Sequence, residues 1–166
     1  MIKKSLIFFI CIFLISPIVF AEDDVSEEEI RESLADVYLA DKDYDKTTSQ
    51  YKEILKNDSE NIKVRVKLAD VLSWQKKYDE ALIEYKKVLD LNKKDMETKK
   101  KLAEIYLWQK EYEKTIVLCR EIINKNKNDI KAKFLLAQAL SYSGDKKEAV
   151  RLYEELLKLK EKQGEK

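Results

Sequence analysis

The chain contains no histidine, and its 166 residues include only two glycines and one proline. The absence of histidine removes the commonest general base and metal ligand from any catalytic site. Two glycines cannot build a glycine-rich phosphate-binding loop. The carboxylates stand beside Lys and Arg at helix-surface spacing, which favours solvated ion pairs over a catalytic dyad. We therefore expect a non-enzymatic protein with no catalytic residues, no bound cofactor and no metal.

Charged residues make up 39% of the chain, and with so little glycine and proline they indicate a helical protein with short loops. A fixed 34-residue period runs through the sequence. It is carried by four Leu-Ala pairs: Leu34-Ala35, Leu68-Ala69, Leu102-Ala103 and Leu136-Ala137. A large apolar or aromatic residue follows three positions after each Ala: Tyr38, Leu72, Tyr106 and Leu140. A constant spacing of this size marks a repeat architecture.

The repeat resembles the tetratricopeptide repeat (TPR), a helix–turn–helix unit of about 34 residues. A small residue of the second helix matches this family (Thr47, Ala81, Thr115, Ala149), as does the large residue four positions later (Tyr51, Tyr85, Cys119, Tyr153). The chain departs from the family where its early Trp is replaced by basic residues: Arg31, Arg65, Lys99 and Lys133. The resemblance implies an all-α, right-handed α-solenoid of four helix pairs, about eight helices. Residues 1–21 are expected to precede it as an N-terminal signal peptide.

We place the domain boundaries on this register. They are a signal peptide at 1–21, an acidic lead-in at 22–27, a repeat domain at 28–161 and a polar tail at 162–166. The repeats cover about 28–61, 62–95, 96–129 and 130–161. The expected helices are 27–40, 44–56, 61–75, 78–91, 95–109, 112–125, 130–142 and 146–160. Ser26 and Glu29 form a predicted capping box for the first helix, and Gly144 is the only flexible turn residue of the array.

Small side chains are expected where helices cross, because only they let two backbones approach closely. The positions are Ala69 and Ala103 in first helices, and Thr47, Ala81, Thr115 and Ala149 in second helices. Cys119 falls at a core position filled by Tyr in the other repeats, so we expect a buried, inert thiol.

The stretch 1–21 has the features of a secretory signal peptide. Lys3 and Lys4 form a basic start, the apolar stretch 6–20 is shorter than a membrane span, and Val19-Phe20-Ala21 suits a signal peptidase. We expect cleavage after Ala21 and a periplasmic or secreted product with no stable membrane span. A retained N-terminal anchor is the alternative. Cys11 lacks the preceding small residues of a lipid-modified cysteine.

Cleavage would remove Lys3 and Lys4 and no acid, which leaves 31 basic and 32 acidic side chains. That balance gives no reason to expect nucleic acid or an anionic membrane surface as a partner.

Three aromatic residues recur at the repeat period: Trp74, Trp108 and Tyr142. The resemblance implies that first helices line a concave groove and that these positions face its ligand. The full candidate groove is Glu32, Asp36, Val66, Asp70, Trp74, Lys100, Glu104, Trp108, Phe134, Gln138 and Tyr142. Its acids (Asp36, Asp70 and Glu104) favour a neutral or basic ligand. The alternative is that Trp74 and Trp108 only pack, against Tyr78 and Tyr112 of their own pairs.

The function implied by the resemblance is a protein-binding scaffold that presents its groove to a protein or peptide, and the predicted signal peptide places this scaffold in the bacterial cell envelope. The alternative is a glycan-binding accessory of envelope polysaccharide assembly or export.

The last predicted helix carries Leu152, Leu156, Leu157 and Leu159 with no capping helix after it. An exposed apolar strip there would indicate a weak homodimer or a partner contact through the C-terminal pair.

Overall fold

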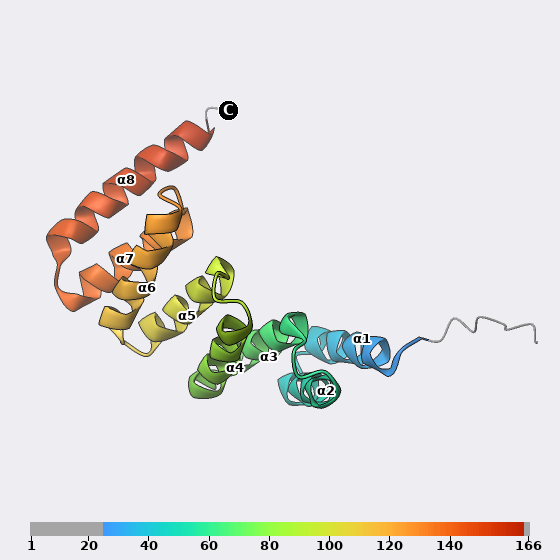
Figure 1. Cartoon of the computed structure of the whole chain (residues 1–166). Helices are drawn as coiled ribbons and strands as arrows, with labels where there is room; N and C mark the ends of the chain where they lie inside the picture. The colour runs from blue at the N-terminus through green and yellow to red at the C-terminus, as the bar shows by residue number, and fades with distance from the viewer. Residues whose placement is uncertain (1–24, 165–166) are drawn as a thin grey trace, which may run out of the picture.

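The computed structural model describes residues 25–164, and in that range the protein is an all-α solenoid of eight helices (Figure 1). The helices are α1 (Glu27–Ala40), α2 (Tyr44–Asn57), α3 (Ile62–Trp74), α4 (Tyr78–Leu91), α5 (Met96–Trp108), α6 (Tyr112–Lys125), α7 (Ile130–Ser143) and α8 (Lys146–Gly164). The expected helices are confirmed to within two positions at every end but one. That exception is α8, which continues to Gly164, so the expected polar tail begins as helix. The predicted signal peptide lies outside the described residues.

Most helices begin directly after a residue whose side chain caps the first turn. The predicted capping box is present, since the Ser26 hydroxyl accepts from the Glu29 N–H and the Glu29 carboxylate accepts from the Ser26 N–H. Five other helices begin after an Asx residue that accepts a backbone N–H: Asp43, Asn61, Asp95, Asp129 and Asp145. Each cap satisfies one of the orphan donors of the first turn.

The turn inside each pair contains one residue in the left-handed region. These residues recur at the repeat period: Lys42 (φ 58°), Lys76 (φ 60°), Lys110 (φ 63°) and Gly144 (φ 104°). Gly144 is the only glycine among these four turn residues, but the left-handed conformation is not confined to it. The turn requires left-handed backbone in every repeat, and lysine adopts it in three of them despite its Cβ.

Successive helices pack on each other along the array, and the small residues lie where helices cross. The first-helix alanines are fully buried, and so are Thr47, Ala81, Thr115 and Ala149. The basic residues that replace the family's Trp each reach the second helix of their own pair. The contacts are Arg31–Gln50, Arg65–Glu84, Lys99–Glu121 and Lys133–Glu155. A basic side chain thus makes a polar contact between the two helices of each pair.

No helix within residues 25–164 is long and apolar enough to cross a membrane. Figure 1 shows α1 and α8 at opposite ends of the array, with the other pairs between them in chain order.

Candidate functional site

The three periodic aromatics end first helices and remain about half exposed. Exposure is 54% for Trp74, 50% for Trp108 and 62% for Tyr142. Each ring lies against a tyrosine that begins the second helix of the preceding pair. The ring centroids are 6.3 Å apart for Tyr44–Trp74, 5.7 Å for Tyr78–Trp108 and 5.7 Å for Tyr112–Tyr142, all tilted.

This geometry corrects the expected packing partners. The alternative in which the rings only pack pairs Trp74 with Tyr78 and Trp108 with Tyr112, each within its own pair. The rings instead contact Tyr44 and Tyr78, which belong to the preceding pair. The contact therefore crosses from one repeat to the next. Each aromatic both fastens neighbouring repeats and keeps part of its surface open to solvent.

Two hollows open beside these rings. The larger, of about 440 Å³, lies between α5 and α7, and the smaller, of about 100 Å³, lies between α3 and α5. Candidate groove residues in the larger hollow are Glu104, Trp108, Phe134, Gln138 and Tyr142. Those in the smaller one are Asp70, Trp74, Glu104 and Trp108. Because Glu104 and Trp108 line both, the two hollows join into one surface, which we call the aromatic groove.

The carboxylates of the aromatic groove are already paired. Asp70 accepts from the Tyr85 hydroxyl and from Lys101, and Glu104 forms an ion pair with Lys131. Burial, and then the hydrogen bond to Asp70, raises the pKa of Tyr85, so this hydroxyl stays a donor. The groove is consequently far less acidic than its carboxylates suggest.

The remaining four candidates lie outside both hollows. Glu32 pairs with Lys63 and Lys67, and the hydrogen bond from Lys67 is the main cause of its lowered pKa. The Asp36 carboxylate is largely exposed, 3.8 Å from Lys67. Val66 is half-buried against the core. Lys100 bridges Glu97 and Asp129, and its hydrogen bond to Glu97 chiefly raises its pKa.

Sequence reasoning missed the lysines that neutralise the groove. Each lies on the first helix of the repeat that follows its acid: Lys101 and Lys131 in the aromatic groove, and Lys63 and Lys67 beside Glu32, outside it. It also missed Tyr44 and assigned Tyr78 and Tyr112 to the wrong rings, although these tyrosines share the 34-residue period. Comparing the charge as well as the size of equivalent residues in the four repeats would have identified both the lysines and the tyrosines.

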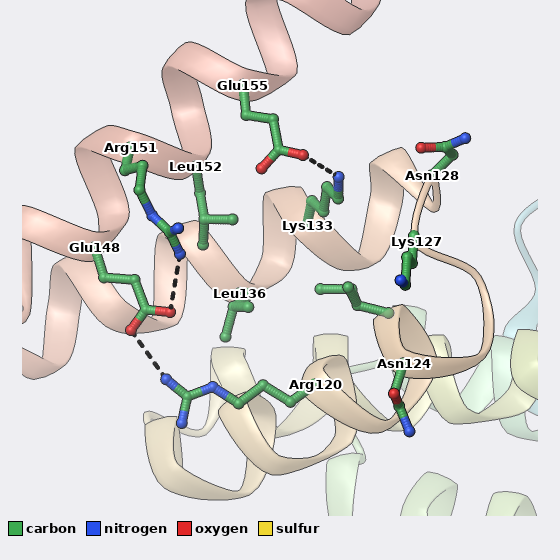
Figure 2. Close-up of a pocket in the computed structure, with 11 residues that line it drawn as sticks. Arg120, Asn124, Lys127, Asn128, Lys133, Leu136, Glu148, Arg151, Leu152 and Glu155 are labelled. Carbon is green, nitrogen blue, oxygen red and sulfur yellow. Dashed lines mark hydrogen bonds and ion pairs between the residues drawn. The ribbon is translucent and has the colours of Figure 1, made fainter.

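A third hollow, of about 630 Å³, lies between α6, α7 and α8 (Figure 2). Its charged side chains face one another: Glu148 accepts from Arg120 at 2.9 Å and lies 3.8 Å from Arg151, and Glu155 pairs with Lys133. We interpret it as an ion-pair network between repeats. Among residues 25–164 no cluster of potential metal ligands is found.

Two family models match the chain, both described as tetratricopeptide repeat, at residues 38–105 and 134–166. The solved structure of MamA superposes with a TM-score of 0.76 at 19% identity, covering 86% of this chain and 84% of that one. A MamA fragment from Desulfovibrio magneticus RS-1 gives 0.74 at 14% identity, covering 81% and 77%.

YrrB, described as a TPR protein with an unusual peptide-binding site, gives a TM-score of 0.70 at 15% identity, covering 82% of this chain and 70% of that one. No curated protein matches the chain. At these identities the solved structures establish the fold and leave the ligand open.

Proposed function

The chain is a tetratricopeptide repeat protein, and from that premise we propose that it is a non-enzymatic scaffold that binds a partner protein or peptide in the aromatic groove. The observation that carries the proposal is the cluster of Trp108, Phe134 and Tyr142 around the larger hollow, with all three rings substantially exposed. Large apolar rings left open beside a concavity are typical of a recognition surface.

The tyrosine partners favour binding by these rings. Tyr78 holds Trp108 and Tyr112 holds Tyr142, so the exposed faces are already oriented before a ligand arrives. A preoriented aromatic loses little rotamer entropy on binding and still offers a large contact area. Packing and recognition are therefore compatible roles for the same side chain.

The charges of the groove indicate the chemistry of the partner. Asp70 and Glu104 are paired with lysines of the next repeat, so an incoming peptide meets a nearly neutral surface whose larger hollow combines aromatic rings with polar groups. We propose an extended peptide segment with apolar or aromatic side chains. The similar fold of YrrB, whose description names a peptide-binding site, supports this class of ligand.

A glycan is the second candidate. The larger hollow combines aromatic rings with Gln138, Lys131 and Glu104, which is a suitable lining for stacking on sugar rings and bonding their hydroxyls. Saturable binding of peptidoglycan or exopolysaccharide fragments would favour the glycan. Capture of a protein that competes with no glycan fragment would favour the peptide.

We propose the cell envelope as the site of action, on the evidence of the sequence of residues 1–21. Intact-mass analysis of the protein from its own cells should give an N-terminus at Glu22. A full-length product released only by detergent would contradict cleavage and favour an anchor.

Proximity labelling from the protein in its own envelope tests the scaffold. The wild type should label a small, reproducible set of proteins. Trp108→Ala should lose that set, because interface aromatics commonly contribute ~1–3 kcal/mol to binding. Ile83→Ala, which removes an equally exposed apolar side chain from α4, is the matched control and should keep it. If both variants kept the labelled set of proteins, the aromatic groove would not be the binding site.

A further inference from the structure

The first helix exposes a face that every later repeat buries. Ile30, Leu34 and Val37 are 56%, 37% and 58% exposed. Their equivalents in the later repeats are at most 4% exposed: Val64, Leu68, Val71, Thr98, Leu102, Ile105, Ala132, Leu136 and Ala139. In the later repeats this face packs against the preceding pair, and α1 has no preceding pair among the described residues. We call Ile30, Leu34 and Val37 the N-terminal face.

The last pair exposes the complementary surface. A hollow of about 580 Å³ lies between α7 and α8, lined almost entirely by apolar groups that include Phe134, Tyr153 and Leu157. The equivalents of Tyr153 are at most 1% exposed where a following first helix covers them: Tyr51, Tyr85 and Cys119. We call this hollow the C-terminal face.

The expected apolar strip of α8 divides accordingly. Leu152 and Leu156 are buried as ordinary core, Leu159 is half-buried, and Leu157 is 65% exposed. The exposed surface is thus a seat for one more first helix, formed by α7 and α8 together. The chain itself supplies a first helix with an uncovered face, at its other end (Figure 1).

The charges of the two faces are complementary. α1 carries five acids and one base, and Glu32 among them pairs with lysines of α3. The charged residues at the C-terminal face are Lys160 and Lys131, of which Lys131 also pairs with Glu104 in its own copy. Inside the array, Asp129 at the start of α7 lies 3.4 Å from Lys100 of the preceding first helix. By the 34-residue register Glu27 takes the place of Asp129 and Phe134 that of Lys100, so this ion pair is not repeated, and the acidic first turn of a docked α1 lies near the start of α7, the helix that carries Lys131.

We propose that a second copy of this chain docks head to tail, with the N-terminal face of one copy seated on the C-terminal face of the other. The docked α1 continues the solenoid across the junction and buries apolar groups as each internal junction does. Because the two faces differ, the contact is heterologous, and each added copy leaves a free face at both ends. The assembly therefore grows beyond a dimer.

Sedimentation velocity on the protein with its native N-terminus tests this arrangement. The wild type should show an average mass that rises with concentration past that of a dimer. Val37→Glu and Leu157→Glu should each be monomeric, since each destroys one of the two faces in every copy. Both side chains are exposed in the single chain, so thermal melting should show each variant folded.

An equimolar mixture of the two variants gives the decisive result. Each variant keeps the face that the other has lost, so the mixture should form a 1:1 dimer and nothing larger. Ile83→Glu, on an exposed apolar position of α4, should assemble like the wild type.

Three outcomes would overturn the proposal. A wild type that stays monomeric at all concentrations would mean that the faces are unoccupied or covered by residues of the same chain. Dimerisation of Val37→Glu alone would indicate a symmetric contact between C-terminal pairs. Loss of assembly in Ile83→Glu would place the contact elsewhere on the array.

Discussion

Three lysines occupy backbone positions that suit glycine. Lys42, Lys76 and Lys110 adopt left-handed conformations at the turn where the fourth repeat has Gly144. The left-handed conformation destabilises an L-residue that has a Cβ by roughly 1–2 kcal/mol, and glycine does not incur this cost. The packing of each helix pair thus determines the turn conformation, and the lysine adopts it despite the cost.

We predict that Lys76→Gly stabilises the protein by about 0.5–1 kcal/mol, because relief of the left-handed strain exceeds the added entropy of the unfolded chain. The Lys76 side chain is exposed, so little contact is lost. Urea denaturation measures the change. Lys94→Gly, at a turn residue with ordinary φ, should instead destabilise, and equal effects of the two changes would contradict the account.

Cys119 is fully buried, and burial raises the pKa of its thiol to about 12. In the chain beginning at Glu22 it is the one cysteine, so a thiol reagent at pH 8 should label it only as fast as the protein unfolds. Labelling rates should therefore follow the unfolded fraction as denaturant is added. Fast, complete labelling of the native protein would show that the core position is open.

The same thiol links stability to alkaline pH. Its folded pKa lies above the unfolded value of about 8.5, so the unfolded state loses its proton first. The contribution to stability is complete below about pH 8.5 and is lost as the pH rises toward about 12. The denaturation midpoint should be lower at pH 10 than at pH 8. The difference between the two should be smaller in Cys119→Val.

At the scale of the helix, close approach depends on the alanine of each Leu-Ala pair. Ala103 is fully buried, and its carbonyl accepts from the Thr115 hydroxyl of the partner helix at 3.3 Å. Ala103→Phe should therefore overpack the third pair and cost ~1–3 kcal/mol or more. Chemical denaturation checks this against Lys94→Ala, an exposed turn change that should stay within about ±0.5 kcal/mol. Equal midpoints would invalidate the repeat register.

The helices were predictable because their signals are local. Ser26 with Glu29 is a capping box in the sequence and in the structure, and the Leu-Ala register predicts which alanines are buried. The partners of Trp74 and Trp108 were not predictable in this way. Whether a ring contacts the tyrosine of its own pair or that of the preceding pair depends on how adjacent pairs are stacked, and that stacking is a property of the array.

The charges of the groove were misread for a related reason. Asp70 and Glu104 stand on first helices as apparent free acids, but Lys101 and Lys131 approach them from the next repeat. Such pairs join residues of different repeats, so a pass along one helix does not reveal them. The preference for a neutral or basic ligand over an acidic one loses the support of these acids, while the expectation of an aromatic surface stays.

Across the whole molecule, repetition converts single side chains into continuous surfaces. The three aromatic pairs recur at every junction between pairs, and the hollows on either side of Trp108 join because Glu104 and Trp108 belong to both. Within residues 25–164 the same repetition leaves one uncovered apolar face at each end. A single architecture thus accounts for both the proposed peptide site and the proposed self-assembly.

The two tryptophans of the chain are Trp74 and Trp108, so its tryptophan fluorescence arises entirely within the aromatic groove. Both rings are about half exposed, and acrylamide should quench them readily in the free protein. Quenching measured with and without the captured partner tests the central claim directly. We predict that the bound partner lowers the quenching constant of the wild type as it saturates. A partner that binds fully while both tryptophans stay as accessible as before would contradict the aromatic groove as the binding site.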